Sequence, residues 1–367
     1  QALNQLKENL KSHNSDLLEV HGNICEQIKK ISEVIGATKI IFEKIISPEE
    51  QDEEISIRSI GIPVETFWQS SMIEVKELPF DLKNMPDIFT EFRKLIESKK
   101  IIVKAPTPLP EKLPPLPDKN IEFSSNTNFP TSLKYKHASF PYLENQFHGG
   151  EKNALAHLEN YLIKKLPHTY KETRNQLYGV NFSTKFSPWL SLGSISARYI
   201  AFRIKEFENQ HGANESSYWI WFELLWRDYF RFIHFKFGKK LYSKNGLSNN
   251  NNLINHNDEN FNKWIQGETG NDLIDAGMKE LRFTGYLSNR MRQIVASYLI
   301  YDLSCDWRKG ALWFESQLID YDVYSNQGNW LYIAGLGTDP RGGRKFNTNK
   351  QNLEYDPNNT YKEMWLN

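Results

Sequence analysis

Apolar and polar positions over the first hundred residues follow two different periods. Leucines recur at helical spacing in residues 1–13, whereas the runs 16–20 (DLLEV), 38–45 (TKIIFEKI) and 64–68 (VETFW) have the short apolar pattern of strands. Strands that alternate with helices are typical of a parallel sheet. We therefore expect residues 1–103 to form an α/β domain.

The pattern changes twice further along the chain. Proline is too dense in residues 105–118 (APTPLPEKLPPLPD) for a helix or a central strand, which predicts an extended linker over residues 104–149. From there the chain is helical, and residues 221–238 (WFELLWRDYFRFIHFKFG) are apolar nearly all round, as in a buried helix. Residues 150–367 are therefore predicted to form a large all-α domain.

Composition narrows the functional classes. Lys plus Arg and Asp plus Glu both number 45, so a nucleic-acid partner would have to meet a local basic patch. Cys25 and Cys305 lie too far apart for a metal-ligand spacing, and the chain has no long apolar run and no signal-peptide pattern. We expect a cytoplasmic, monomeric protein without a membrane segment or a structural disulfide. The 10 Trp indicate a thick core or a stacking surface.

The stretch DYDVYSNQGNW gathers Asp320, Asp322, Asn326 and Trp330 between two apolar-periodic segments. A calcium-binding loop would need Glu at its twelfth position, where Leu331 stands, so we expect no metal site. A hydrolytic carboxylate pair would need an acid or a nucleophile beside it, and none is adjacent. An acidic loop that only caps the next helix is the alternative.

The stretch TGYLSNRMRQIVASYL predicts a helix that begins after Ser288, with Asn289, Arg292 and Gln293 on one side of its first turn. Arg292 either anchors a planar, acceptor-rich ligand with the help of one of the two aspartates, or makes a surface ion pair. Spacing alone does not separate these two interpretations.

Hydroxyl groups and a lysine precede a predicted helix start at Pro188 in STKFSPWLSLGSIS, where free N–H groups favour a phosphate. Ordinary helix capping is the alternative. Glu223 and Arg227, four residues apart, form either a helix salt bridge or a buried functional pair. Together with the dense tryptophans, these features suggest a large aromatic cofactor with a pyrophosphate, such as a flavin dinucleotide.

Several long stretches, taken in order, resemble the photolyase/cryptochrome superfamily and look most like its DASH-type cryptochromes. They are YKETRNQLYGVNFSTKFSPWLSLGSIS, FELLWRDYFRF and GETGNDLIDAGMKELRFTGYLSNRMRQIVASYLIYDLSCDWRKGALWFESQLIDYDVYSNQGNWLYIAGLGTDPRGGRKFN. The DASH branch is indicated by AGLGTDPRGGRKFN, Gln293 and Tyr332. The resemblance implies a Rossmann-like parallel-sheet α/β domain followed by a large all-α FAD-binding domain.

In this family the α/β domain holds an antenna chromophore, commonly a folate such as methenyltetrahydrofolate. From the pattern of the chain we expect the family's first strand-helix unit to be missing and the sheet to be incomplete, which argues against a bound antenna.

The resemblance implies one non-covalent FAD in the helical domain. Asp320 would pair with Arg292 near the flavin ring, Asp322 would meet the adenine and ribityl end, and Asn326 would face flavin N5. The residues that would bind the phosphates and surround the flavin are Tyr170, Thr184, Lys185, Phe186, Ser187, Asn289, Arg292, Asp320, Asp322 and Asn326.

Electron transfer to the flavin is also implied. Trp330 would be the proximal donor and Trp307 the next, while the position expected for a third tryptophan holds Ile254 in an Asn-rich stretch. We therefore expect slow photoreduction or an exit through another ring, such as Tyr298 or Trp313.

The implied reaction is blue-light-driven repair of cyclobutane pyrimidine dimers, preferentially in single-stranded DNA, with the lesion flipped into a pocket above the flavin. Glu223 would hydrogen-bond the lesion. The other residues expected to meet the lesion or the DNA backbone are Trp226, Tyr332, Gln293, Arg290, Arg341, Arg344 and Lys345. A blue-light photoreceptor without repair activity is the alternative, and a flavin-binding relic is a third possibility.

Overall fold

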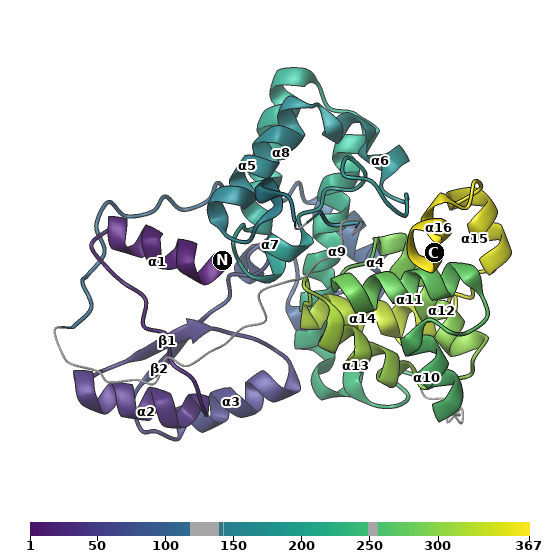
Figure 1. The fold of residues 1–367 in the computed structure, drawn as a ribbon. Coiled ribbons are helices and arrows are strands. Elements are labelled where there is room, and N and C mark those ends of the chain that lie inside the picture. The colour runs from purple at the N-terminus through teal and green to yellow at the C-terminus, as the bar shows by residue number, and fades with distance from the viewer. Residues whose placement is uncertain (118–138, 142, 249–255) are drawn as a thin grey trace.

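The structure is a computed structural model that describes residues 1–117, 139–141, 143–248 and 256–367. Figure 1 shows a small region with both strands beside a larger region built of helices. This arrangement confirms the fold class predicted from the sequence. No helix in the described part of the chain is long and apolar enough to cross a membrane.

The N-terminal region is built around a parallel pair of strands. Its elements are α1 (Ala2–Ser12), α2 (Ile24–Ile35), β1 (Ile40–Glu43), α3 (Pro48–Arg58) and β2 (Val64–Phe67). The register sets Ile40 opposite Val64, and α3 provides the crossover that a parallel pair requires. Pro48 stands in the first turn of α3, where the absence of an N–H group does no harm.

The strand predicted at residues 16–20 is wrong. These residues have no regular secondary structure, and Leu18 is exposed. A strand needs a neighbour to take up its N–H and C=O groups, and the described sheet consists of β1 and β2 alone. Residues 16–20 join neither of these strands, so the apolar run has no partner that would make it a strand.

Residues 68–98 continue from the sheet onto the helical region. They contain η1 (Val75–Glu77), η2 (Leu82–Asn84) and α4 (Phe89–Ser98), and they pack against α9 (Glu215–Phe237). The Phe89 ring stacks on Trp226 with 3.7 Å between ring centroids. The Asp228 carboxylate accepts the N–H groups of Met72 and Ile73, both at 2.8 Å.

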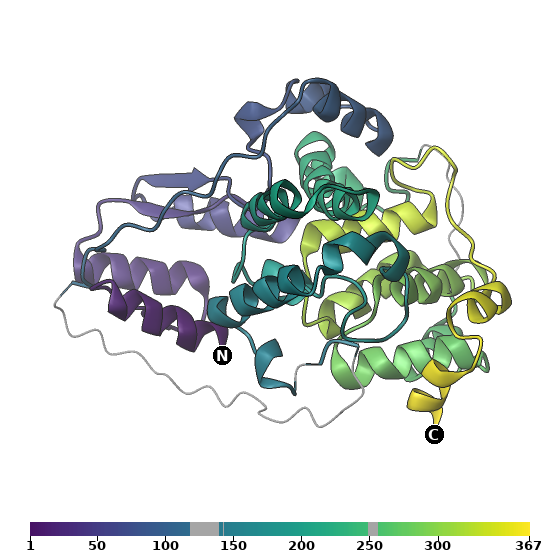
Figure 2. The same cartoon turned by 90° about the horizontal axis from the view of Figure 1, so that it is seen from above.

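The predicted linker is irregular where the structure describes it. Residues 104–117 contain no helix or strand, and η3 (Asn145–Phe147) is a single turn before α5 (Glu151–Ile163). Residues 118–138 and 142 lie outside the described residues. Figure 2 shows the N-terminal end of α1 beside α5, and the Asn9 amide donates to the Glu151 carboxylate at 2.8 Å.

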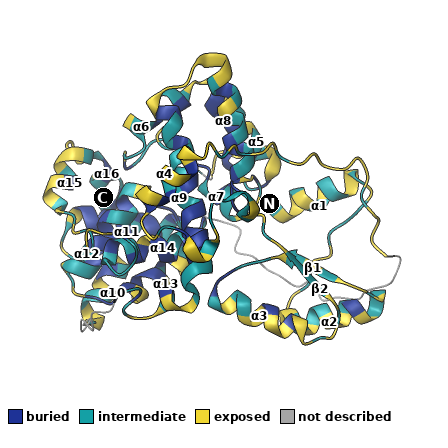
Figure 3. Ribbon diagram, turned by 180° about the vertical axis from the view of Figure 1, so that it is seen from behind, coloured by how far each residue is buried: buried dark blue, intermediate teal, exposed yellow. Residues whose placement is uncertain are grey.

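The helical region surrounds α9, whose buried residues extend from Ser216 to His234, as the apolar pattern predicted. Asn214 and Ser217 form a capping box at its start. The other elements are η4 (Leu166–Thr169), α6 (Tyr170–Thr173), α7 (Ser187–Ser191), α8 (Ala197–His211), η5 (Gly238–Tyr242), α10 (Asp258–Gln266), α11 (Asp272–Thr284), α12 (Asn289–Tyr301), α13 (Trp307–Gln317), α14 (Val323–Ala334), α15 (Thr348–Tyr355) and α16 (Thr360–Leu366). Figure 3 shows most of the burial in this region.

Candidate cofactor and nucleic-acid site

A cavity of about 290 Å³ lies among the helices, and we call it the inner cavity. Its walls come from α6, α7, α9, α12 and α14 and from the segments that precede α7 and α14. Every residue that the resemblance assigned to the cofactor lines it, namely Tyr170, Thr184, Lys185, Phe186, Ser187, Asn289, Arg292, Asp320, Asp322 and Asn326. The fold therefore brings segments that are far apart in the sequence to one place.

A second cavity of about 440 Å³ adjoins the first, and we call it the outer cavity. Trp226, Tyr332, Arg341 and Arg344 line only this one. The residues that line both cavities are Arg174, Glu223, Arg227, Asn289, Gln293, Ser325 and Asn329. Because one set of side chains forms a wall of each, the two cavities are neighbours across a single layer of residues.

Two helix starts supply the polar groups of the inner cavity. The Ser288 hydroxyl accepts the Met291 N–H at 3.3 Å and begins α12, while the Asp322 carboxylate accepts the Ser325 N–H at 2.8 Å and begins α14. Asn289 and Asn326, which line the cavity, stand in the first turns of these helices. The capping interpretation of the DYD motif is therefore correct for Asp322, although it does not exclude a second role.

Arg292 and Asp320 form the ion pair that the resemblance implied. Arg292 Nη2 lies 3.0 Å and 2.8 Å from the two carboxylate oxygens of Asp320, and its Nε donates to the Leu287 carbonyl at 2.9 Å. The Asp320 side chain is only 1% exposed. The pair is therefore largely withdrawn from water, where its attraction is strong and its disruption costly.

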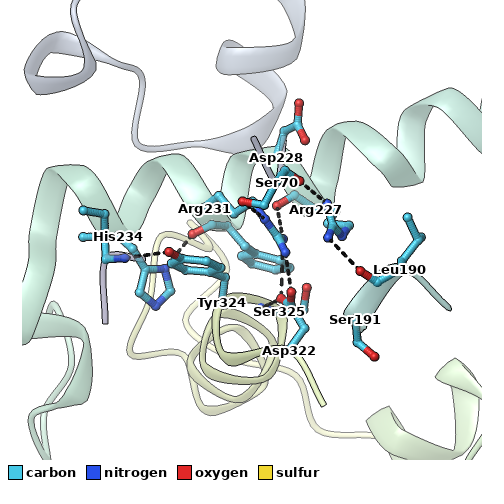
Figure 4. Close-up of polar contacts among 12 residues, drawn as sticks. Ser70, Leu190, Ser191, Arg227, Asp228, Arg231, His234, Asp322, Tyr324 and Ser325 are labelled. Carbon is cyan, nitrogen blue, oxygen red and sulfur yellow. Dashed lines mark hydrogen bonds and ion pairs between the residues drawn. The ribbon is translucent and has the colours of Figure 1, made fainter. Parts of the chain in front are cut away.

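Asp322 is held by a second arginine that the sequence did not reveal (Figure 4). Arg231 on α9 donates to both of its carboxylate oxygens, with Nη1 at 3.4 Å from Oδ1, and also to the Ser70 hydroxyl at 3.2 Å. Burial alone would raise the pKa of Asp322, but Arg231 and then Arg227 outweigh it and hold that pKa well below its usual range. Asp322 therefore stays ionised and fixed in the cavity wall.

Neither prediction for Glu223 and Arg227 is right, because these two residues do not pair with each other. Glu223 forms an ion pair with Arg174, whose guanidinium lies 4.3 Å from the centre of the Trp219 ring. Arg227 donates to the Ser70 and Leu190 carbonyl groups. The partners of both side chains lie outside α9, so the spacing of Glu223 and Arg227 along one helix cannot reveal them.

Burial shifts the pKa of two residues that line both cavities, Glu223 and Arg227. Burial raises the pKa of Glu223, and Arg174 opposes the shift without cancelling it. Burial, then repulsion from Arg231, lowers the pKa of Arg227 to about 10. Glu223 therefore holds its proton to a higher pH than an exposed glutamate does.

The predicted tryptophan relay is only partly within the site. Trp330 lines the inner cavity, and its ring lies 6.3 Å from Trp264 and 5.1 Å from Phe314. Trp307 is buried outside the cavity, with its Nε1 donating to the Lys244 carbonyl at 3.1 Å. The roles of these rings stay predictions. Ile254, at the expected third position, lies outside the described residues.

The predicted basic cluster is divided. Arg344 donates to the Tyr332 hydroxyl and through Nε to Asp339 at 3.0 Å, which holds its guanidinium 4.4 Å from the Tyr332 ring centre. Arg290 lines neither cavity and lies 5.0 Å from the Tyr355 ring centre. Lys345 also lines neither, and it pairs with Asp302 at 3.0 Å.

Comparison with known proteins identifies the family. Residues 219–367 match the model for the FAD binding domain of DNA photolyase, and residues 1–115 match that for DNA photolyase. A Cryptochrome DASH from Synechocystis sp. is 41% identical over the whole of this chain and 75% of its own length, and one from Danio rerio is 42% identical over the whole chain and 71% of its length. The chain belongs to the photolyase/cryptochrome family.

Solved photolyase and cryptochrome structures agree with this assignment. A Synechocystis sp. cryptochrome superposes with a TM-score of 0.93 at 41% identity, covering all of this chain and 76% of that one. A class III photolyase from Agrobacterium tumefaciens gives 0.81 at 25% identity, with the same two coverages. The cofactor of the helical region is thus FAD.

The lining of the inner cavity fits this cofactor. Lys185, with its side chain buried, and the hydroxyl groups of Thr184 and Ser187 are ligands that suit a pyrophosphate. The charged pair of Arg292 and Asp320 and the amide of Asn326 suit the acceptor and donor edges of a flavin. The Asn326 amide nitrogen donates to the Ala311 carbonyl at 3.0 Å, which fixes its orientation.

Sequence reasoning missed three residues of the site. Arg174 and Arg231 bind the carboxylates of Glu223 and Asp322, respectively. The third residue, Tyr286, belongs to the lining of the inner cavity. Their partners are distant in the chain, so no local spacing marks them. The only sequence signal is their place within the stretches that resemble the family.

Proposed function

We propose that this protein uses blue light to repair cyclobutane pyrimidine dimers in DNA, with single strands as its preferred substrate. The observation that carries the proposal is the shared wall between the cavities, because Glu223 and Gln293 face both. A base placed in the outer cavity would lie one side chain away from the cofactor. Reduced FAD, when bound and excited by light, would lend the lesion a single electron that returns to the flavin once the dimer has split, so the repair is redox-neutral overall.

The outer cavity suits an extruded pyrimidine pair. Trp226 and Tyr332 lie with 5.5 Å between ring centroids at an angle of 77°, which gives the two bases separate aromatic surfaces. Glu223 would hydrogen-bond the lesion once Arg174 turns from it to a phosphate. Trp226, Glu223 and Tyr332 would thus bind the lesion and exclude water.

Single-stranded DNA is favoured by the energy of extrusion. Flipping a nucleotide from a duplex costs a few kcal/mol in stacking and pairing, and less in an unpaired strand. Arg341 and Arg344 at the outer cavity would meet the backbone phosphates, with Arg290 and Lys345 beyond its lining. These arginines and the lysine provide a local positive charge on a chain whose formal net charge is zero.

A monomer in a reducing compartment is also part of the proposal. The reducing compartment is supported by the two cysteines, which are both free.

The test is illumination of the reduced protein with an oligonucleotide that carries one thymine dimer, as a single strand and as a duplex. We expect restored thymines in the light only, faster in the single strand, and loss of repair in Glu223→Ala and Trp226→Ala. Glu215→Ala, an exposed glutamate on the same helix, is the matched control and should repair normally. A protein that binds and photoreduces FAD yet repairs neither substrate would be a photoreceptor instead.

A further inference from the structure

Tyr286 lines the inner cavity but belongs to none of the predicted cofactor or DNA contacts. Its side chain is buried and lines the cavity, and two cations lie over its ring. The Lys185 ammonium is 5.8 Å and the Arg292 guanidinium carbon 5.2 Å from the ring centre. Both distances are within the range in which the ring quadrupole attracts a cation.

The backbone around Tyr286 leaves its ring little freedom. Gly285 ends α11 with a left-handed φ of 68°, and a Cβ there would meet the Gln317 carbonyl oxygen at 2.7 Å. The Thr284 hydroxyl accepts the Tyr286 N–H at 3.1 Å. The ring packs against Phe140 with centroids 5.5 Å apart. The cations therefore meet a fixed surface.

Lys185 depends on this ring more than Arg292 does. Arg292 is anchored by Asp320 and by the Leu287 carbonyl. Lys185 forms no hydrogen bond or ion pair within the described part of the chain, and its charge is met only at longer range by the buried Glu280 carboxyl group. An ammonium that is withdrawn from water without an ion-pair partner is costly, so the nearby ring supplies attraction that water would otherwise give.

We propose that Tyr286 is a positioning residue that sets the Lys185 ammonium, together with the Arg292 guanidinium, in place for the anionic dinucleotide before it binds. The inference rests on the proposed function only in taking FAD as the ligand of the inner cavity. A cation held in position beforehand loses less freedom on binding, so the aromatic ring raises cofactor affinity without touching the reaction.

The experiment is a titration of FAD into cofactor-free protein, followed by flavin fluorescence, which needs no catalytic turnover. Tyr286→Met keeps an apolar side chain in the cavity wall but removes the ring, and we expect about a tenfold rise in Kd. Tyr286→Phe keeps the ring and should stay within about threefold of the original protein. Tyr355→Met is the matched control, because it removes a ring 5.0 Å from Arg290 outside both cavities.

A double-mutant cycle with Lys185→Met separates positioning from general packing. If the ring acts through Lys185, Tyr286→Met weakens binding much less when Lys185 is already replaced. Equal losses in both backgrounds would overturn the proposal, as would a Tyr286→Phe protein that binds as poorly as Tyr286→Met. If Tyr286→Met does not fold, a Tyr286→Phe protein whose Kd for FAD rises about tenfold would still overturn the proposal, because that variant keeps the ring. An unsubstituted protein that binds no FAD would instead refute the proposed function.

Discussion

The ion pairs of Asp320 and Asp322 in the helical region are less exposed than the ion pairs of the α/β region. In the α/β region, α1 has no buried residue, and the Lys39–Glu65 pair across the strands leaves its side chains 50% and 44% exposed. In the helical region, Asp320 is 1% exposed and Arg231 is 2% exposed, each within an ion pair. Electrostatic interactions are stronger away from water, so the helical region is where charges can orient a ligand.

This difference in exposure predicts how much a charged residue of each region contributes to stability. Surface ion pairs contribute little to stability and are screened by salt. Buried pairs resist the loss of either partner because the remaining charge is left without compensation. Four experiments test this contrast, beginning with the largest expected effect.

The first compares the hydrophobic packing of the regions. Phe232→Ala in the centre of α9 should lower the free energy of unfolding by about 3–5 kcal/mol, because it opens a cavity at a fully buried position. Leu3→Ala on α1, where the side chain is 50% exposed, should change it by less than about 0.5 kcal/mol. Denaturant unfolding of both variants measures the values, and similar losses would refute the contrast.

The second compares the ion pairs. Asp320→Asn should lower the free energy of unfolding by about 3 kcal/mol, because Arg292 then keeps its charge without a carboxylate. Glu65→Gln in the exposed pair with Lys39 should have almost no effect. Thermal and denaturant unfolding at low and high salt are the measurements. An Asp320→Asn protein that is as stable as the original would show that the ion pair does not stabilise the wall of the inner cavity.

The third concerns pH. Burial lowers the pKa of Lys185 to about 8, against the pull of the Glu280 carboxyl group and with repulsion from Arg292, while Tyr286 stays neutral because burial raises its pKa to about 12. Above pH 8 the free protein loses the ammonium that meets the pyrophosphate, so FAD affinity should fall by up to about tenfold per pH unit. The fall should continue until the pH reaches the pKa of Lys185 in the complex, which the anionic pyrophosphate raises. FAD titrations from pH 7 to 10 measure this. Lys185→Met should flatten the profile, and an unchanged slope there would exclude Lys185 as the source.

The smallest effect concerns DNA binding at the surface. Arg341→Gln should weaken binding of all sequences and reduce the slope of log affinity against log salt by about one unit or less. Lys39→Gln, which removes a cation from the α/β region, should leave the slope unchanged. Fluorescence anisotropy of an undamaged single strand at several salt concentrations provides the comparison. If Lys39→Gln changes the slope equally, the outer cavity does not define the DNA path.

Much of the site could be predicted because helix starts and buried helix faces depend on residues that are close together in the sequence. Ser288 and Asp322 cap helices as their sequence positions indicated, and α9 is buried as its apolar pattern predicted. The residues assigned to the cofactor also line one cavity. They could be assigned from the sequence because the family resemblance covers long stretches in order rather than single motifs. The roles of these residues in binding and electron transfer remain predictions.

Tertiary structure alone decided which charges meet. The sequence favoured Glu223 with Arg227 on one helix, whereas the fold pairs Glu223 with Arg174 and Asp322 with Arg231. It also left residues 16–20 without a strand partner. Helix formation and capping depend on neighbours within a turn or two, so the sequence by itself determined them. Ion pairing and strand pairing join segments far apart in the chain, and only the packing of the whole chain selects among the available partners.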